Sequence, residues 1–391
     1  MKEEYMFEYF PENYPWSLAT MWAINRGGAI SEIEDACRPL REFSKRNDKI
    51  AQEAWFQNWK KVAGRVDALA QENEKTGQNL SAGRKYLRAS IYYFMAERMI
   101  SSKDSRKVQT YQQGLTAFKK GMLLRKETIE WVEVPFQGKS LPALFSKAPG
   151  KDPAPCMIHF DGFDGLKESI YRGSAEEFRR RGISLLVVDH PGVGEALRLR
   201  NMTTGSDTEV PAKACVDYLE TRPDVDKNRI GIVALSLGGY YAPRAAAFEK
   251  RLKCCVAWGA IWDWGELVQK RIVGKGGELS VPDWVDQLLW VLGKSSVEEA
   301  VAFAKQFTLE GVADKITCPL LVIHGENDRQ IPVAHAEKTI SAAVNSPETK
   351  LKLFRLSEGG AEHCQADNSA MAIDYIADWV AEVLGGEVKG I

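Results

Sequence analysis

A serine stands in this sequence where an enzyme would expose a nucleophile. Residues 230–240 read I-G-I-V-A-L-S-L-G-G-Y, an apolar strand-like run that passes through Ser236 directly into a helical stretch. Small residues two positions before and two positions after the serine permit the sharp turn of a nucleophile elbow, which projects the serine Oγ. Ala234 stands where glycine is more usual and keeps that position small. The pattern predicts that Ser236 is a catalytic nucleophile.

An elbow serine needs a basic histidine and an acid that orients it, and the acid precedes the histidine along the chain. After the strand-like run 320–324 the chain reads G-E-N-D-R-Q-I-P, which makes Asp328 the candidate acid. Glu326 is a nearby competitor that lies closer to the strand. After the run 350–356, a glycine-rich loop carries His363, the candidate base. The other histidines are expected to have structural roles: His159, His190, His324 and His335.

Attack on a carbonyl builds negative charge on its oxygen, so acyl chemistry needs N–H donors close to the nucleophile. One expected donor is the backbone N–H of Leu237, and the other is that of Phe163, in the D-G-F-D-G-L-K-E loop after strand 156–160. The same loop offers an alternative set of metal ligands: Asp161, Asp164 and Glu168. The rest of the sequence contains no matching ligand cluster and no dinucleotide-binding fingerprint, so we predict neither a metal nor a cofactor.

The elements that must position these side chains follow one another from about residue 127. A hairpin over 128–145 is followed by short apolar runs that alternate with helical stretches. Such alternation predicts βαβ units and a mostly parallel sheet with helices on both faces. Strands are expected at 156–160, 183–188, 229–235, 253–258, 319–324 and 350–356, and helices at 167–181, 207–220, 237–249 and 369–385.

Residues 1–126 have a different pattern, because apolar side chains recur there at steps of three or four. This spacing predicts amphipathic helices without strands. One stripe consists of Ala51, Trp55, Trp59, Val62, Val66 and Leu69, and two others lie within 87–99 and 108–122. We therefore predict a helical domain over 1–126 and an α/β domain over 127–391.

A helical insertion at about 262–312 interrupts the α/β domain. It holds four of the eleven tryptophans of the chain. Because it follows the carboxyl end of a strand, it is expected at the sheet edge where open α/β sheets bind ligands. Trp262 and Trp264 are candidate substrate contacts, and His190 is expected to approach the rim of the same pocket. The alternative is that these aromatic residues only pack the insertion against the rest of the protein.

Composition restricts the class of protein further. The chain has 52 Lys+Arg and 53 Asp+Glu and a net charge of −1, so no overall charge attracts nucleic acid or an anionic membrane. The start, MKEEYMFEYF, lacks the basic and apolar regions of a secretory signal, and no apolar run reaches the ~18 residues of a membrane span. The seven cysteines form no C-x-x-C pair and are expected to be reduced. We expect a cytoplasmic enzyme with a small-molecule substrate.

Several motifs together resemble a known family. They are G-F-D-G-L-K-E, D-H-P-G-V-G-E, the A-L-S-L-G-G elbow, W-G-A-I-W-D-W and the late H-C. They are similar to the α/β-hydrolases with a helical N-terminal domain that are named for fermentation/respiration switch protein. That group includes 2,6-dihydroxypseudooxynicotine hydrolase and the fungal polyketide-shortening hydrolases. The resemblance implies an α/β-hydrolase fold, a triad of Ser236, Asp328 and His363, a pocket between helical domain and core, and a homodimer or higher homo-oligomer.

The resemblance also bears on the reaction, because members of the family often cleave a carbon–carbon bond next to a carbonyl. An additional acidic residue contributes in one relative, and its nearest counterparts here are Asp263 and Glu266. The leading prediction is therefore a serine hydrolase that cleaves such a bond in an aromatic or polyketide-like ketone. The leaving carbanion would take its proton from His363 or from an acid such as Glu266.

Two alternatives remain open at this point. An ester, lactone or amide hydrolase would use the same triad, because the triad does not encode the leaving group. A non-enzymatic binding or regulatory protein on the same fold is disfavoured, since a binding protein gains nothing from keeping all three triad residues.

Overall fold

The computed structural model describes residues 7–46, 48–150 and 153–388. Residues 1–6, the beginning of the segment considered for a secretory signal, lie outside the described residues. The chain forms two compact units. The helical unit contains residues 7–129 and 278–288, and the core unit contains 130–277 and 289–388. The chain first passes from the helical unit to the core unit close to the boundary expected at residue 126.

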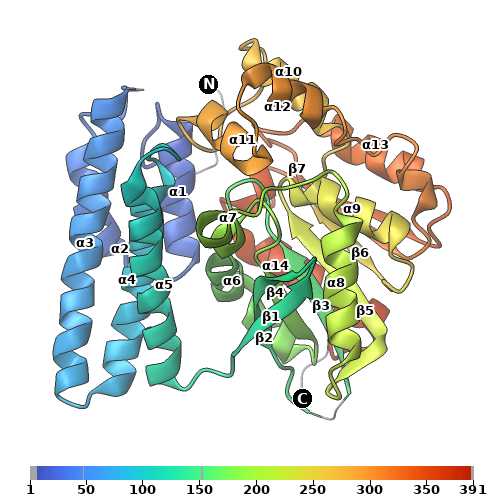
Figure 1. Cartoon of the computed structure of the whole chain (residues 1–391), viewed down its shortest axis with the longest axis horizontal. Helices are drawn as coiled ribbons and strands as arrows, with labels where there is room; N and C mark the ends of the chain where they lie inside the picture. The colour runs from blue at the N-terminus through green and yellow to red at the C-terminus, as the bar shows by residue number, and fades with distance from the viewer. Residues whose placement is uncertain (1–6, 47, 151–152, 389–391) are drawn as a thin grey trace. The chain divides into compact units, whose positions relative to one another are not determined.

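An eight-stranded sheet forms the centre of the core unit, with the strand order β1-β2-β4-β3-β5-β6-β7-β8 (Figure 1). β1 and β2 form an antiparallel hairpin, β2 pairs antiparallel with β4, and all later neighbours are parallel. The predicted mostly parallel sheet is thereby confirmed. The strands are β1 (Glu130–Phe136), β2 (Lys139–Ser146), β3 (Ala154–Phe160), β4 (Ser184–Val188), β5 (Val225–Leu235), β6 (Cys255–Trp258), β7 (Leu320–Gly325) and β8 (Thr349–Phe354).

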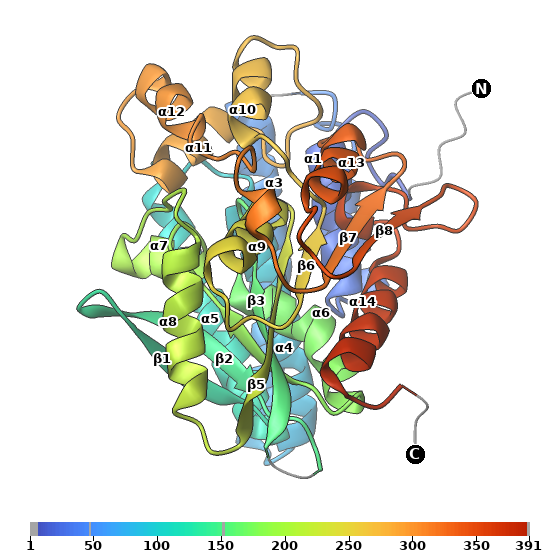
Figure 2. The same ribbon diagram turned by 90° about the vertical axis from the view of Figure 1, so that its right-hand side faces the viewer.

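Helices cover both faces of this sheet (Figure 2). α6 packs against α14 on one face, and α8 packs against α9 on the other. Every residue of β3, β4, β6 and β7 is buried, which explains their nearly continuous apolar sequences. The helices of the unit are α6 (Lys167–Arg180), α7 (Gly194–Arg200), α8 (Glu209–Glu220), α9 (Gly238–Phe248), α10 (Trp264–Ile272), α12 (Val297–Ala304), α13 (Ala334–Ala342) and α14 (Ser369–Leu384), with 3₁₀ turns η2 (Ala313–Lys315) and η3 (His363–Gln365).

The parallel register brings the ends of several strands to one edge of the sheet. Phe160 at the end of β3 pairs with both Val188 and Ala234, and Leu235 pairs with Trp258. The loops that follow these strands therefore emerge side by side, as the carboxyl ends of parallel strands do in ligand-binding α/β proteins. The loop that carries Phe163, after β3, and the elbow that carries Ser236, after β5, both lie at this edge.

Five helices and one short 3₁₀ turn make up most of the helical unit. A ladder of aromatic rings runs through it, with centroid separations of 5.1 Å between Trp16 and Trp55 and 5.4 Å between Trp55 and Trp59. Leu69, which we predicted as part of the buried stripe, is 42% exposed, because the helix turns its buried face to Ala70 instead. The elements are α1 (Tyr14–Asn25), α2 (Ile30–Cys37), η1 (Arg38–Leu40), α3 (Lys49–Lys75), α4 (Asn79–Arg98) and α5 (Ser105–Arg125).

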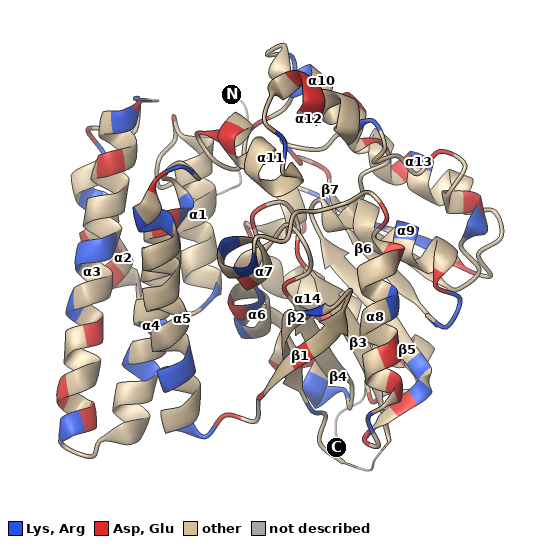
Figure 3. Ribbon diagram, in the orientation of Figure 1, with Lys and Arg blue, Asp and Glu red and all other residues tan. Residues whose placement is uncertain are grey.

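Charges of both signs are interspersed along α3, whereas the charged residues of α5 are all basic (Figure 3). No helix among the described residues is long and apolar enough to cross a membrane.

Part of the insertion belongs to the helical unit. Residues 278–288, which include the first turns of α11 (Trp284–Leu292), cluster with α3–α5 rather than with the sheet. Two acidic residues explain the attachment: Asp283 accepts a hydrogen bond from Gln52 (3.0 Å), and Asp286 accepts one from Ser101 (2.8 Å). The sequence analysis assigned the whole insertion to the α/β domain, because pairing across such a sequence separation leaves no local pattern.

Candidate active site

Ser236 lies in a strained turn between β5 and α9. Its φ is +61°, a left-handed conformation that non-glycine residues seldom adopt. The turn is possible because its neighbours are small. A Cβ on Gly239 would lie 2.2 Å from the Gly259 carbonyl oxygen, and one on Gly238 would lie 2.6 Å from the Ala234 Cβ. These close approaches explain why the residues at these positions of A-L-S-L-G-G are as small as glycine and alanine.

A continuous chain of hydrogen bonds joins the three residues that the sequence nominated as a triad. Ser236 Oγ lies 2.9 Å from His363 Nε2, and His363 Nδ1 lies 2.7 Å from Asp328 Oδ2. Both the Asp328 and the His363 side chains are almost inaccessible to solvent. The structure thus brings together residues that are separated by up to 127 positions in the sequence.

The surroundings of Asp328 keep its carboxylate charged although it is buried. Burial alone would raise the pKa of Asp328, but the adjacent His363 more than offsets this, so the pKa lies below its usual value. The other carboxylate oxygen accepts hydrogen bonds from the backbone N–H groups of Gln330 (2.8 Å) and Ile331 (2.9 Å). Burial by itself would lower the pKa of His363, but the Asp328 carboxylate raises the pKa by more, and the net result is a pKa well above the normal value.

The loop after β3 approaches the elbow closely. A Cβ on Gly162 would lie 2.7 Å from the Ser236 Cβ and 3.1 Å from the Leu237 backbone nitrogen. Only glycine fits at such a distance, and its neighbour Phe163 is therefore held beside the nucleophile. Leu237 precedes the first turn of α9, so its N–H belongs to the end of the helix where backbone donors converge. These are the two positions from which the sequence analysis expected oxyanion donors.

Comparison with known proteins identifies the family. A family model described as "Esterase FrsA-like" matches residues 50–379. The chain belongs to this FrsA-like esterase family. Alpha/beta hydrolase xenA of Xenoacremonium sinensis is 30% identical over 341 residues, which cover 77% of this chain and 78% of that protein. The 20-hydroxy-prefusarin hydrolase FUS2 of Gibberella moniliformis is 28% identical over 361 residues, or 82% and 85% of the two chains.

A bacterial relative links sequence and structure. The 2,6-dihydropseudooxynicotine hydrolase of Paenarthrobacter nicotinovorans is 25% identical over 347 residues, 86% of each chain. A crystal structure of 2,6-dihydroxy-pseudo-oxynicotine hydrolase has a TM-score of 0.75 at 24% identity, and the match covers 95% of this chain and 98% of that one. The chain is therefore a hydrolase with the α/β-hydrolase fold, and the family that the motifs suggested is confirmed.

Within this FrsA-like fold, the structure shows the protein contacts of Trp262 and Trp264, the two predicted substrate contacts of the insertion. Trp264 is buried and packs its ring against Phe163 (5.9 Å between centroids) and Phe307 (5.0 Å). Trp262 is partly exposed, and its backbone N–H donates to His335 Nδ1 (3.1 Å). The Trp264 ring therefore supports the loop that holds Phe163.

The two acidic candidates lie at the start of α10. Asp263 is the N-cap of this helix and accepts a hydrogen bond from the backbone N–H of Glu266 (2.8 Å). The Glu266 side chain is 46% exposed and pairs with Lys270, which lowers its pKa. A carboxyl group with a lowered pKa is ionised near neutral pH, so Glu266 in this state has no proton to donate.

His190, which we expected to approach the rim of the pocket, is buried. Its Nε2 donates to the Asp161 carbonyl (3.1 Å), and burial lowers its pKa. The residue also lines a cavity of about 210 Å³ in the core unit, together with Thr204 and Asp207. Asp161, one of the alternative metal ligands, instead accepts hydrogen bonds from the N–H groups of Gly162 (2.7 Å) and Leu166 (3.1 Å).

Sequence reasoning missed the residues that hold the triad loops. Glu362 accepts hydrogen bonds from Asn327 (2.6 Å) and Arg329 (3.0 Å), and so ties the loop of His363 to that of Asp328. Cys364 has a left-handed φ of +50° and places its Sγ 3.5 Å from His363 Nε2. The only signal in the sequence is that these residues adjoin Asp328 and His363.

Proposed function

We propose that this chain is a serine hydrolase in which Ser236 is the nucleophile, His363 the general base and Asp328 the orienting acid. The hydrogen-bond chain from Ser236 through His363 to Asp328 carries the proposal. A serine at the end of a strand, in a left-handed turn and hydrogen-bonded to a buried His–Asp pair, has the arrangement that activates a hydroxyl.

Each step of acyl transfer has a candidate group. His363 Nε2 takes the Ser236 proton as Oγ attacks a carbonyl carbon, and Asp328 stabilises the imidazolium that forms. The N–H groups of Leu237 and Phe163 stabilise the oxyanion of the tetrahedral intermediate. His363 then returns the proton to the leaving group, and water hydrolyses the acyl-enzyme in a second cycle. No step requires a metal or cofactor, so turnover is expected to survive EDTA and dialysis.

The bond cleaved is, in this proposal, a carbon–carbon bond next to a carbonyl in an aromatic or polyketide-like ketone. The family resemblance supports this choice. The leaving group is then a carbanion, which must be delocalised by a second carbonyl or an aromatic ring and must receive a proton. Protonated His363 suits that task better than Glu266, because the Lys270 partner keeps the Glu266 carboxyl ionised.

Ester hydrolysis is the second candidate. The description of the matching family is "Esterase FrsA-like", and ester cleavage uses the same acyl-enzyme with a better leaving group. The distinction therefore depends on the leaving group that the site accepts, and not on the nucleophile.

A matched pair of acetyl donors separates the two candidates. Benzoylacetone and phenyl acetate would both leave an acetyl group on Ser236, but the first expels a carbanion and the second a phenolate. We expect kcat/KM to be higher for benzoylacetone, with acetate and acetophenone as products. Turnover of phenyl acetate alone would favour the esterase. The Ser236→Ala variant measures background cleavage of each compound.

A further inference from the structure

The loop after β3, residues 161–167, is fastened to the segment after β4, residues 189–195. Three of the hydrogen bonds between them are His190 Nε2 to the Asp161 carbonyl (3.1 Å), the Gly194 N–H to the Gly165 carbonyl (3.2 Å) and the Lys167 N–H to Asp189 Oδ1 (2.8 Å). The first of these loops carries Phe163, the expected second oxyanion donor. The 189–195 segment therefore supports the 161–167 loop through these hydrogen bonds.

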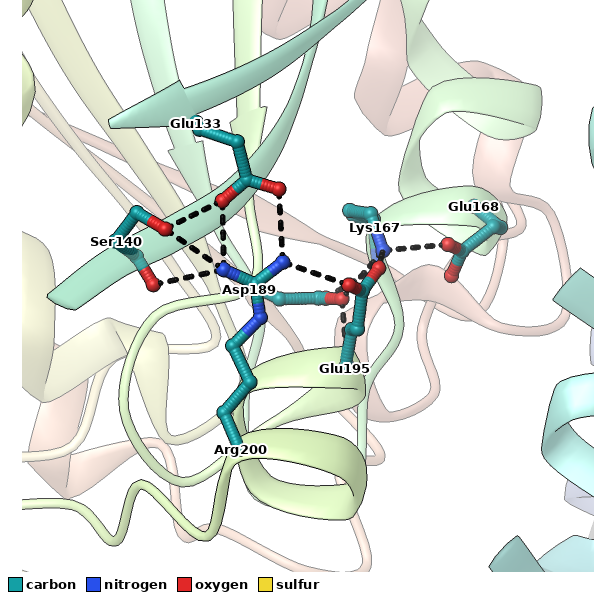
Figure 4. Close-up of polar contacts among 7 residues, drawn as sticks. All are labelled: Glu133, Ser140, Lys167, Glu168, Asp189, Glu195 and Arg200. Carbon is teal, nitrogen blue, oxygen red and sulfur yellow. Dashed lines mark hydrogen bonds and ion pairs between the residues drawn. The ribbon is translucent and has the colours of Figure 1, made fainter. Parts of the chain in front are cut away.

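Lys167 is the centre of this attachment (Figure 4). Its ammonium lies 2.9 Å from Asp189 Oδ2, 3.0 Å from Glu195 Oε2 and 2.6 Å from Glu168 Oε1. Its side chain is 1% exposed, and those of Asp189 and Glu168 are fully buried. Asp189 receives both the backbone N–H and the side chain of Lys167, so one carboxylate fixes the end of the loop in position and direction.

A second cation, Arg200, adjoins the cluster around Lys167. Arg200 pairs with Glu195 at 2.7 Å and, on its other side, with Glu133 at the edge of the sheet. Burial raises the pKa of Glu168, although Lys167 partly opposes the shift. The cations Lys167 and Arg200 share the carboxylate of Glu195 and so link the buried Asp189 to Glu133.

The loop has little freedom to move without affecting the elbow. Gly162 approaches the elbow so closely that an added methyl group would lie 2.7 Å from both the Ser236 Cβ and the Leu235 carbonyl oxygen, and would clash with them. In the 189–195 segment, a Cβ on Gly194 would lie 2.0 Å from the Asp189 carboxylate, so this segment is also tightly packed. A loop held by the elbow at Gly162 and by Asp189 at Lys167 transmits a shift at Lys167 to Phe163, which lies between them.

We propose that Lys167 is a positioning residue, which sets the place of the Phe163 N–H relative to Ser236 by binding the Asp189 carboxylate. The inference rests on the proposed serine nucleophile. A buried ion pair contributes little net stability compared with apolar packing, so its value here lies in fixing a geometry. Lys167 would not touch the substrate and acts only through the 161–167 loop.

A fluorophosphonate tests this directly, because it needs no knowledge of the natural substrate. Ser236 Oγ attacks phosphorus, the P–O bond forms as the P–F bond breaks, fluoride leaves, and His363 takes the serine proton. The phosphoryl oxygen occupies the oxyanion site in the transition state. The second-order rate constant of labelling therefore reports the position of the donors.

Lys167→Met and Asp189→Asn are the test variants, and Lys107→Met is the matched control. Lys107 is equally buried, at 2%, and pairs with Glu97 at 2.9 Å, but it lies in the helical unit. We expect labelling of Lys167→Met and Asp189→Asn to be at least ~10-fold slower than wild type, and that of Lys107→Met to stay within ~2-fold, because loss of a whole oxyanion donor costs ~10²–10³. Rates are compared per folded molecule, with the folded fraction taken from near-UV circular dichroism.

Asp189→Asn keeps the volume of the site and decides the question if Lys167→Met does not fold. Equal labelling rates in wild type and folded Asp189→Asn would overturn the inference, as would an equal slowing in Lys107→Met. Failure of the wild type itself to be labelled at Ser236 would instead refute the proposed function. With phenyl acetate, a positioning role lowers kcat and leaves KM within ~2-fold, since the loop acts in the transition state.

Discussion

Lys107 in the helical unit and Lys167 in the core unit are both almost inaccessible to water, yet their partners differ in kind. Lys107 pairs with Glu97 and donates to the carbonyls of Glu97 (2.8 Å) and Ile100 (3.2 Å), all within ten residues. It closes the turn between α4 and α5. Lys167 instead joins loops that follow two different strands, through Asp189, 22 residues away, and Glu195, 28 residues away.

The comparison extends to the units themselves. In the helical unit, the buried hydroxyls of Thr20 and Ser90 donate to carbonyls of their own helices, and the rings of Trp16, Trp55 and Trp59 pack against one another in the interior. In the core unit, the buried Asp189, Asp328 and His363 follow different strands and bond residues of other loops. Burial by itself is therefore no sign of function; the segments that a buried group connects are the better guide.

Ser236→Ala in the core should have the largest effect on activity of any single change. Loss of a triad nucleophile typically lowers kcat ~10⁶-fold, while the fold should tolerate the small change. Ser90→Ala is the matched variant in the helical unit, where Ser90 is buried and its Oγ donates to the Leu87 carbonyl (2.8 Å). Steady-state kinetics with thermal melts should show activity lost only in the first variant. More than a tenth of wild-type activity in Ser236→Ala would refute the nucleophile assignment.

Asp328→Asn should lower kcat by ~10⁴-fold, since the amide favours the wrong tautomer of His363. The variant should also change the pH profile. Activity requires neutral His363, and Asp328 raises the pKa of that residue, so the acidic limb of kcat/KM should move to lower pH in Asp328→Asn. Glu97→Gln removes a buried carboxylate from the helical unit and should leave the limb unmoved. An unchanged limb in Asp328→Asn would contradict the assigned coupling.

Trp264→Ala and Trp59→Ala remove buried indoles from the two units. Each should lower the free energy of unfolding by ~3–5 kcal/mol, the usual cost of such a cavity. Only Trp264 packs on Phe163, so only Trp264→Ala should also lower kcat per folded molecule. Urea titrations and kinetics on the same samples separate the two effects. Equal kcat in both variants would make Trp264 a packing residue alone.

Glu168→Gln tests whether folding raises the pKa of Glu168, the neighbour of Lys167, through the pH dependence of stability. Because the folded-state pKa of Glu168 is raised, its contribution is fully present below the unfolded value of ~4.3 and is lost as pH rises through the folded value. The free energy of unfolding of the wild type should therefore decrease as the pH rises through this range. The decrease should be smaller in Glu168→Gln. Urea titrations at several pH values provide the measurement. The same pH dependence of the free energy of unfolding in both proteins would show that folding does not raise the pKa of Glu168.

Glu266→Gln should have the smallest effect. The side chain is half-exposed and paired with Lys270 on the surface of α10, where such pairs contribute about 0–1 kcal/mol. We expect kcat on benzoylacetone within ~2-fold of wild type. A loss of ~100-fold or more would restore Glu266 as a proton donor and would mean that the pair with Lys270 opens during turnover.

Much of the core unit could be predicted from sequence, because its signals are local. Short apolar runs that alternate with helical stretches indicated β3 to β8, and the small residues around Ser236 indicated the elbow. The chain order of Ser236, Asp328 and His363 nominated three residues that lie within hydrogen-bonding distance. The attachment of residues 278–288 to the helical unit was missed, since it depends on Asp283 and Asp286 meeting distant partners.

By itself, the sequence determined which residue types stand at the ends of strands and how small their neighbours are. Steric limits on a turn act within a few residues, so a pentapeptide suffices to express them. Only the tertiary structure decided that Lys167 meets Asp189 and Glu195 and that Trp264 supports Phe163. The first pairing follows from the parallel register of β3 and β4, which sets side by side loops that the chain keeps many residues apart.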